Sequence, residues 1–141
     1  MKPAARRKAR KFALQGLYQL YMADHAVSDT EAHLQEEINP EKVDLDYFQQ
    51  LLRGCAKETA YLDDLYQEFL DRPFADLTPI ECCILRLACF EMDKHHEVPY
   101  KVVINEALEL GKRFGAVDAH KFLNGVLDKL ANKLRPLETQ S

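Results

Sequence analysis

Apolar residues recur every three or four positions along most of the chain, which is the period of an amphipathic helix. Over residues 3–23, one stripe at 100° per residue carries small and apolar side chains: Ala9, Ala13, Gly16, Leu17 and Leu20, with Phe12 at its edge. Pro3 suits the first turn of this helix, because the N–H that proline lacks would have no partner there. No segment shows the alternation of β-branched residues that is typical of strands, so the sequence predicts an all-α fold.

Capping residues and prolines bound the other predicted helices. We expect a short helix over residues 28–38, with Ser28 or Asp29 as its N-cap, and a longer one over residues 44–70 that Gly54 could kink. The next start is the clearest in the chain, because residues 78–81 supply a Thr N-cap, a Pro at the first helical position and a Glu at the third.

Two more helices follow, over residues 99–114 and residues 118–134, the first stopped by Gly115 and the second capped by Asp118. The total is six or seven helices. The segment around Pro73 divides them into an N-terminal subdomain, about residues 1–73, and a C-terminal subdomain, about residues 74–141. We expect about three helices in each part.

Composition excludes several classes of protein. No apolar run approaches the roughly 18 residues of a membrane span, and the N-terminus lacks the apolar core of a signal peptide, so we expect a soluble, cytoplasmic protein. The four cysteines form no CxxC pair, which favours buried, reduced thiols. They are Cys55, Cys82, Cys83 and Cys89.

The distribution of charge is uneven. The first 23 residues hold six basic side chains and no acidic one, whereas the rest holds thirteen Lys and Arg against twenty-three Asp and Glu. We call these six residues the basic arm: Lys2, Arg6, Arg7, Lys8, Arg10 and Lys11. Basic side chains at a helix N-terminus oppose the helix dipole, so their presence points to a polyanion rather than to stability. A frayed, solubilising N-terminus is the simpler alternative.

The first predicted helix also has a second, outward stripe that begins basic and becomes apolar and aromatic: Arg7, Lys11, Leu14, Tyr18 and Tyr21. Together with Met22, its apolar part forms a patch that a monomer would rather cover. Either the second half of the chain or a partner protein could cover it.

Two stretches carry a family resemblance. AARRKARKFALQGLYQL at residues 4–20 and VPYKVVINEALELGKRFGAVDAHKFLNGVLDKL at residues 98–130 resemble the NusB family of bacterial transcription antitermination factors. The resemblance extends over essentially the whole chain. It implies an all-helical, non-catalytic protein without a cofactor or metal, in which two three-helix subdomains pack against each other as one domain. Such a protein binds single-stranded boxA RNA of nascent ribosomal transcripts together with ribosomal protein NusE, in the antitermination complex on RNA polymerase.

The resemblance also implies which residues act. The predicted RNA-binding residues are Lys2, Arg6, Arg7, Arg10, Asp118, Lys121 and Phe122. The predicted NusE-binding residues are Tyr18, Met22 and Glu81. Lys8 and Lys11 are assigned to general electrostatics, and a weak homodimer through the first helix, which would hide the basic arm, is left open.

Several of these residues have simpler explanations. Phe122 lies at the edge of an apolar stripe, where an aromatic is usually part of the core rim, and Phe114 is assigned mainly to the core. Asp118 and Glu81 both suit helix capping. If the position of Asp118 lies at the RNA surface, as the resemblance implies, removing its charge would strengthen RNA binding.

Two other functions compete with this hypothesis. An all-helical adaptor would use the basic arm on a protein and would not distinguish RNA sequences. A small helical enzyme would need a cleft with an acid or base, and no motif in the sequence points to one. A metal site from Cys82, Cys83 and Cys89 with His95 and His96 is disfavoured, because these spacings do not converge on one point.

Overall fold

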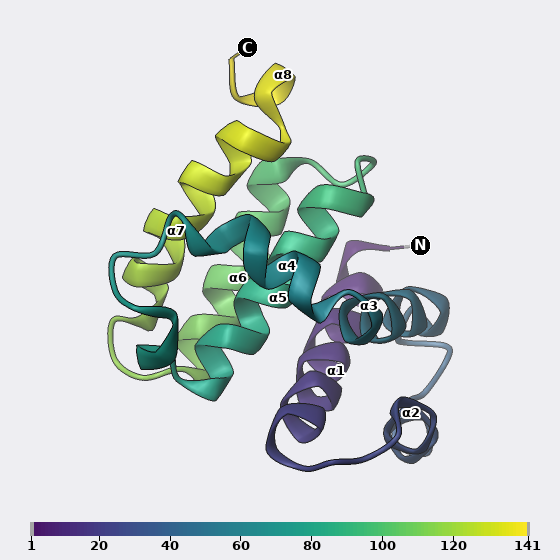
Figure 1. The fold of residues 1–141 in the computed structure, drawn as a ribbon. Coiled ribbons are helices and arrows are strands. Elements are labelled where there is room, and N and C mark those ends of the chain that lie inside the picture. Colours follow the sequence, from purple (N-terminus) through teal and green to yellow (C-terminus); the bar gives the residue numbers. More distant parts are fainter. Residues whose placement is uncertain (1, 141) are drawn as a thin grey trace. The chain divides into compact units, whose positions relative to one another are not determined.

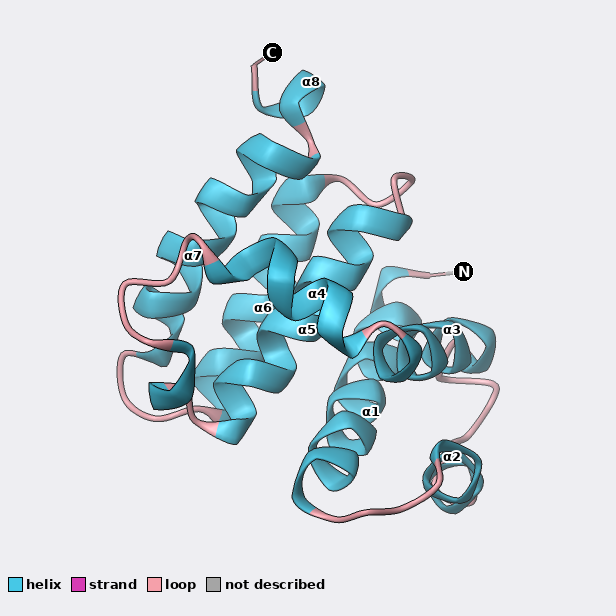
Figure 2. Ribbon diagram, in the orientation of Figure 1, coloured by secondary structure: helices cyan, strands magenta, loops and turns pink. Residues whose placement is uncertain are grey.

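The computed structural model describes residues 2–140, which form eight α-helices, one short 3-10 helix and no strand (Figures 1 and 2). The helices are α1 Pro3–Met22, α2 Val27–Gln35, α3 Leu45–Lys57, α4 Thr59–Gln67, η1 Phe74–Asp76, α5 Pro79–Lys94, α6 Tyr100–Phe114, α7 Ala119–Leu134 and α8 Pro136–Thr139. The all-α prediction is confirmed. No helix in this part of the chain has the length and hydropathy needed to cross a membrane.

The chain separates into two compact units between Glu58 and Thr59, earlier than the Pro73 segment suggested. The reason is α4, which packs against α5 and α7 of the second unit. Asp63 on α4 accepts two hydrogen bonds from the guanidinium of Arg86 on α5, at 2.9 and 2.8 Å. Tyr66, one turn further along α4, is fully buried.

The same boundary corrects the prediction of one helix over residues 44–70. The structure has two helices there, because the backbone of Glu58 leaves the helical region at φ −112° and ψ 27°. The Glu58 N–H still bonds to the Gly54 carbonyl, so α3 ends with a complete last turn. Apolar residues keep their helical spacing through the break, and the sequence pattern therefore could not reveal it.

The first unit is a three-helix layer in which α1 contacts both α2 and α3. Gly16 allows a close approach of these helices, since a Cβ atom there would lie 2.8 Å from Leu52 Cδ1 and 3.1 Å from Leu34 Cδ1. The short helix α2 starts after Ala26 rather than at a Ser28 or Asp29 cap. Alanine has no side-chain oxygen, so α2 begins without the capping hydrogen bond that we predicted.

The second unit is built around α5, which contacts α4, α6 and α7. Eleven of its sixteen residues are buried, as expected for a helix that is apolar almost all round. The predicted capping box is present: Thr78 Oγ1 accepts from the Glu81 N–H at 3.2 Å, and Glu81 Oε1 accepts from the Thr78 N–H at 3.0 Å. On the neighbouring pair, Gly111 of α6 lets Leu123 of α7 approach closely.

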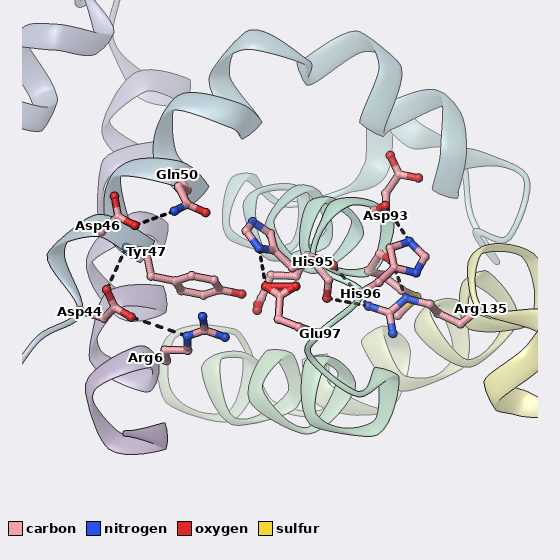
Figure 3. Close-up of polar contacts among 12 residues, drawn as sticks. Arg6, Asp44, Asp46, Tyr47, Gln50, Asp93, His95, His96, Glu97 and Arg135 are labelled. Atoms are coloured by element: carbon pink, nitrogen blue, oxygen red, sulfur yellow. Dashed lines mark hydrogen bonds and ion pairs between the residues drawn. The ribbon is translucent and has the colours of Figure 1, made fainter. Parts of the chain in front are cut away.

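A buried arginine, Arg135, donates hydrogen bonds to backbone carbonyls at the C-terminal end of α5 (Figure 3). Arg135 follows α7 and donates from Nε to the Met92 carbonyl at 2.7 Å and from Nη2 to the His95 carbonyl at 3.0 Å. It also pairs with Glu138 of α8, a helix that the sequence did not predict. A cation at a helix C-terminus suits the dipole and satisfies carbonyls that have no partner within the helix.

Candidate nucleic-acid interface

The basic arm occupies the first turns of α1. Lys2 is the N-cap residue, and Pro3 lies in the first helical turn, as the sequence predicted. Lys2, Arg7 and Lys8 are exposed. No acidic side chain stands in the first turn, so the positive end of the helix dipole and the basic side chains add to one positive potential.

Arg6 is held in place by α3 (Figure 3). Its guanidinium carbon lies 4.2 Å from the centroid of the Tyr47 ring, and its Nε lies 3.6 Å from Asp44 Oδ2. The other oxygen of Asp44 accepts from the Tyr47 N–H at 3.1 Å and so caps α3. The Asp44 N–H in turn donates to the Ala5 carbonyl at 3.2 Å. The N-terminus of α3 therefore fixes the direction of the arm.

Arg10 differs from the other predicted RNA-binding residues. It is buried, with 4 % of its surface exposed, and its guanidinium carbon lies 5.6 Å from the Tyr47 ring centroid. The prediction placed it on the RNA-facing surface from its charge and from the resemblance. Arg10 is therefore the buried member of the basic arm, which contributes to its charge without being exposed.

The second group of predicted RNA-binding residues lies at the start of α7 in the other unit. Asp118 has φ 66° and ψ 7°, and it is the one non-glycine residue with a positive φ among residues 2–140. Asp118 is the N-cap residue of α7, as the sequence predicted, but its carboxylate makes no capping hydrogen bond. The carboxylate forms an ion pair with Lys121, in which Asp118 Oδ1 lies 3.4 Å from Lys121 Nζ. Both side chains are largely exposed.

Phe122 is half-buried, and an arginine covers one face of its ring. The guanidinium carbon of Arg72 lies 4.0 Å from the ring centroid, within the range of a cation–π contact. Arg72 Nε also donates to Asp71 at 2.9 Å, and its Nη1 lies 4.0 Å from Glu81 Oε2. The hydrogen bond to Asp71 raises the pKa of Arg72 further above its ordinary value.

Sequence reasoning missed Arg72 as part of this site. Arg72 lies in the loop after α4, fifty positions before Phe122, and no periodic pattern relates a loop residue to a helix face. At Arg72 the sequence indicated only the end of a helix, because a residue before proline avoids the α-helical region.

The predicted partner residues lie in both units. Tyr18 and Met22 are exposed at the end of α1, by 39 and 58 %, together with Tyr21. Leu14, which the outward stripe included, is buried at 2 % exposure, so the apolar patch is shorter than we predicted. Glu81 is 6 % exposed and has both oxygens engaged, one in the capping box and one facing Arg72.

The four cysteines are not part of the protein surface. All four are buried and none forms a disulfide, and burial raises the pKa of the Cys83 thiol to about 12. Cys82 Sγ lies 3.5 Å from the Tyr66 hydroxyl. Within residues 2–140, no group of three or more His, Cys, Asp or Glu side chains is placed to hold a metal ion.

Comparisons with a family model and with known sequences all find similarity to one family. The family model described as "NusB family" matches residues 7–132. Transcription antitermination protein NusB from Idiomarina loihiensis is 51 % identical over 136 residues, which cover 96 % of this chain and 98 % of that protein. Its counterpart from Marinobacter nauticus is 48 % identical over 139 residues, covering 99 % of this chain and 88 % of that protein.

A solved structure agrees with this result. NusB from T. maritima superposes with a TM-score of 0.81 at 26 % identity, and the match covers both chains completely.

Proposed function

The chain belongs to the NusB family, and we propose that it binds boxA RNA of nascent ribosomal transcripts together with NusE. In this proposal the pair acts within the antitermination complex on RNA polymerase. NusB proteins are transcription antitermination factors and not enzymes, which implies RNA and protein partners. The identities of the RNA element and of the protein partner are the proposed part.

The basic arm supports the RNA half of the proposal. Lys2 and Arg7 are exposed, and Arg6 is oriented by Tyr47 and Asp44, so at least three cations surround the positive end of α1. Cations in such an arrangement bind phosphates by releasing counterions, which gives affinity without sequence preference. About four phosphate contacts would give a slope of log affinity against log salt near −3 for a single strand.

Discrimination between RNA sequences would come from the start of α7. Single-stranded RNA is read mainly through unstacked bases that rest on aromatic or arginine planes. Phe122 is half-exposed, and Lys121 and Asp118 next to it can donate to and accept from base edges. Phosphate contacts in one unit and base contacts in the other would then have separate roles.

The proposed NusE surface has its main support in α1. Tyr18, Tyr21 and Met22 are exposed over its last turns, and aromatic and Met side chains are enriched at protein interfaces. Glu81 is proposed with them, although its carboxylate is engaged in capping α5. We expect Tyr18→Asp to abolish NusE binding, while Glu81→Ala weakens NusE binding and also destabilises α5.

The test is a binding titration of labelled boxA RNA and a scrambled RNA of the same composition, with and without NusE, over a series of salt concentrations. We expect a preference for boxA that NusE increases. Arg53→Ala is a suitable control, because Arg53 is an exposed arginine paired with Glu31 and lies outside the basic arm. Sedimentation of the RNA-free protein checks whether a homodimer covers α1.

Two outcomes would contradict the proposal. Equal binding of both RNAs would reduce the basic arm to a non-specific polyanion site. Binding of NusE without any RNA discrimination would favour the protein adaptor.

A further inference from the structure

The stack of Arg72 on Phe122 is a feature that the predicted RNA site does not include. The guanidinium carbon of Arg72 lies 4.0 Å above the Phe122 ring, and Arg72 is itself exposed. One face of the aromatic ring is therefore occupied. A base that approached from this side would meet the guanidinium first.

Three separate segments fix the position of this guanidinium. Asp71 accepts from its Nε, Glu81 at the start of α5 lies 4.0 Å from its Nη1, and Phe122 at the start of α7 lies beneath it. Since Glu81 is itself held by the capping box, the carboxylate that faces Arg72 is anchored to α5. A long side chain with such contacts loses less entropy when it binds a ligand.

The nearby charges decide which role suits Arg72. Two carboxylates, those of Asp71 and Glu81, offset its positive charge, so its attraction for a phosphate is weaker than that of the basic arm. Its planar guanidinium keeps the ability to stack, because arginine is weakly hydrated and rests readily on flat π systems. The surroundings therefore favour stacking over phosphate neutralisation.

We propose that Arg72 is a further RNA-contacting residue, whose guanidinium, stacked on Phe122, forms the outer layer on which an unpaired base of the RNA rests. The proposal builds on the proposed function and names an additional residue of the same RNA site. Phe122 then acts partly through Arg72, since it supports the plane that the base touches. The chemistry recognised is the π face of an unstacked base, with sequence preference coming from the edges of that base.

The decisive variant is Arg72→Lys, which keeps the charge and removes the plane. We expect boxA affinity to fall about fivefold or more, in line with the usual cost of losing one stacked base. The salt slope stays that of the wild type, because the number of cations is unchanged. Arg53→Lys is the matched control, since Arg53 also bonds a carboxylate but covers no aromatic ring, and it leaves both quantities unchanged.

A double-mutant cycle with Phe122→Leu tests the stack itself. If Phe122 supports Arg72, the two losses of affinity do not add, and Arg72→Lys has little further effect once Phe122 is Leu. Thermal unfolding of each variant, followed by circular dichroism, checks that the second unit stays folded. An exposed side chain such as Arg72 is expected to change stability little.

Three results would overturn the proposal. Wild-type affinity in Arg72→Lys would mean that the plane of Arg72 does not contact the RNA. Tighter binding in Arg72→Ala would make Arg72 a cover that RNA displaces. Fully additive losses of affinity in the cycle would mean that Arg72 and Phe122 act independently.

Failure of the proposed function is recognised independently, because it appears in the wild-type protein as a lack of preference for boxA over scrambled RNA. Binding of neither RNA would overturn both the proposed function and the role of Arg72.

Discussion

Both candidate RNA-binding regions contain an arginine, an aromatic ring and a carboxylate, but the aromatic ring is exposed to a different degree in each. In the first unit, Arg6 lies over Tyr47 next to Asp44; in the second, Arg72 lies over Phe122 next to Glu81. Tyr47 is buried at 2 % exposure, whereas Phe122 is half-exposed. The same cation–aromatic–carboxylate arrangement is therefore a support for the basic arm in one unit and part of the surface in the other.

This difference assigns separate consequences to the two aromatic residues. A buried ring contributes mainly to the stability of its unit and affects RNA indirectly, through the direction of the arm. A half-exposed ring contributes less to stability and contacts the ligand or the side chain that does. Variants that change one aromatic at a time can therefore test the comparison directly.

The largest effect is expected for Tyr47→Ala. Removing a fully buried aromatic costs about 3–5 kcal/mol, so the free energy of unfolding should fall by this order. Urea denaturation followed by circular dichroism measures it. Tyr47→Leu, which keeps an apolar side chain, should preserve the fold and weaken boxA and scrambled RNA by the same factor. A loss confined to boxA would contradict the supporting role of Tyr47.

Phe122→Ala should have the next largest effect, on RNA selectivity. Base stacking contributes about 1–3 kcal/mol per base, so boxA affinity should fall roughly tenfold while scrambled RNA is little affected. Fluorescence anisotropy titrations with both RNAs measure the ratio of the boxA affinity to the affinity for scrambled RNA. Tyr61→Ala is the control, since Tyr61 is an exposed aromatic of the same unit with Lys94 5.4 Å from its ring centroid. An unchanged ratio in Phe122→Ala would place discrimination elsewhere.

Arg7→Ala should weaken both RNAs equally and by a smaller amount. One lost phosphate contact reduces the salt slope by about 0.7 for a single strand, and this change is the specific readout. The measurement is the same anisotropy titration at four or more salt concentrations, with Arg53→Ala beside it. A loss for boxA alone, at constant slope, would move Arg7 from the phosphate-binding group to the base-reading group.

The smallest effect is expected for Asp118→Asn. Removing the carboxylate 3.4 Å from Lys121 leaves that cation available to RNA, so both RNAs should bind severalfold tighter. Stability should change by less than about 0.5 kcal/mol, because asparagine tolerates the left-handed region. Asp118→Ala should bind RNA equally well but unfold more easily. If Asn proved as destabilising as Ala, the carboxylate would have a capping role after all.

Most of the helical architecture could be predicted from the sequence, because periodicity and capping residues are local properties. The capping box at Thr78 and Glu81 and the helix ending at Leu134 both matched the structure. The break at Glu58 escaped, since the apolar spacing continues through it. Asp118 does lie at the predicted N-cap position, but its left-handed backbone and the lack of a capping hydrogen bond from its side chain left no signal in the sequence.

The candidate sites were less accessible to this reasoning. Charge and resemblance indicate which side chains could bind RNA, but they do not show which are exposed. Arg10 and Leu14 are both buried, although one is charged and the other lies on the outward stripe. Arg72 depends on a contact between residues 72 and 122, and contacts at such sequence separation leave no periodic signal.

Arg135 also bears on the order in which the chain acquires its structure. The carbonyl of Met92, near the end of α5, accepts a hydrogen bond from a side chain 43 positions later. This end of the central helix of the second unit therefore lacks that hydrogen bond until Arg135 has left the ribosome. The three helices of the first unit all lie before Thr59 in the chain. During synthesis the basic arm and its support can therefore be assembled early. The helix that carries Phe122 takes its final place only with the last segment of the unit.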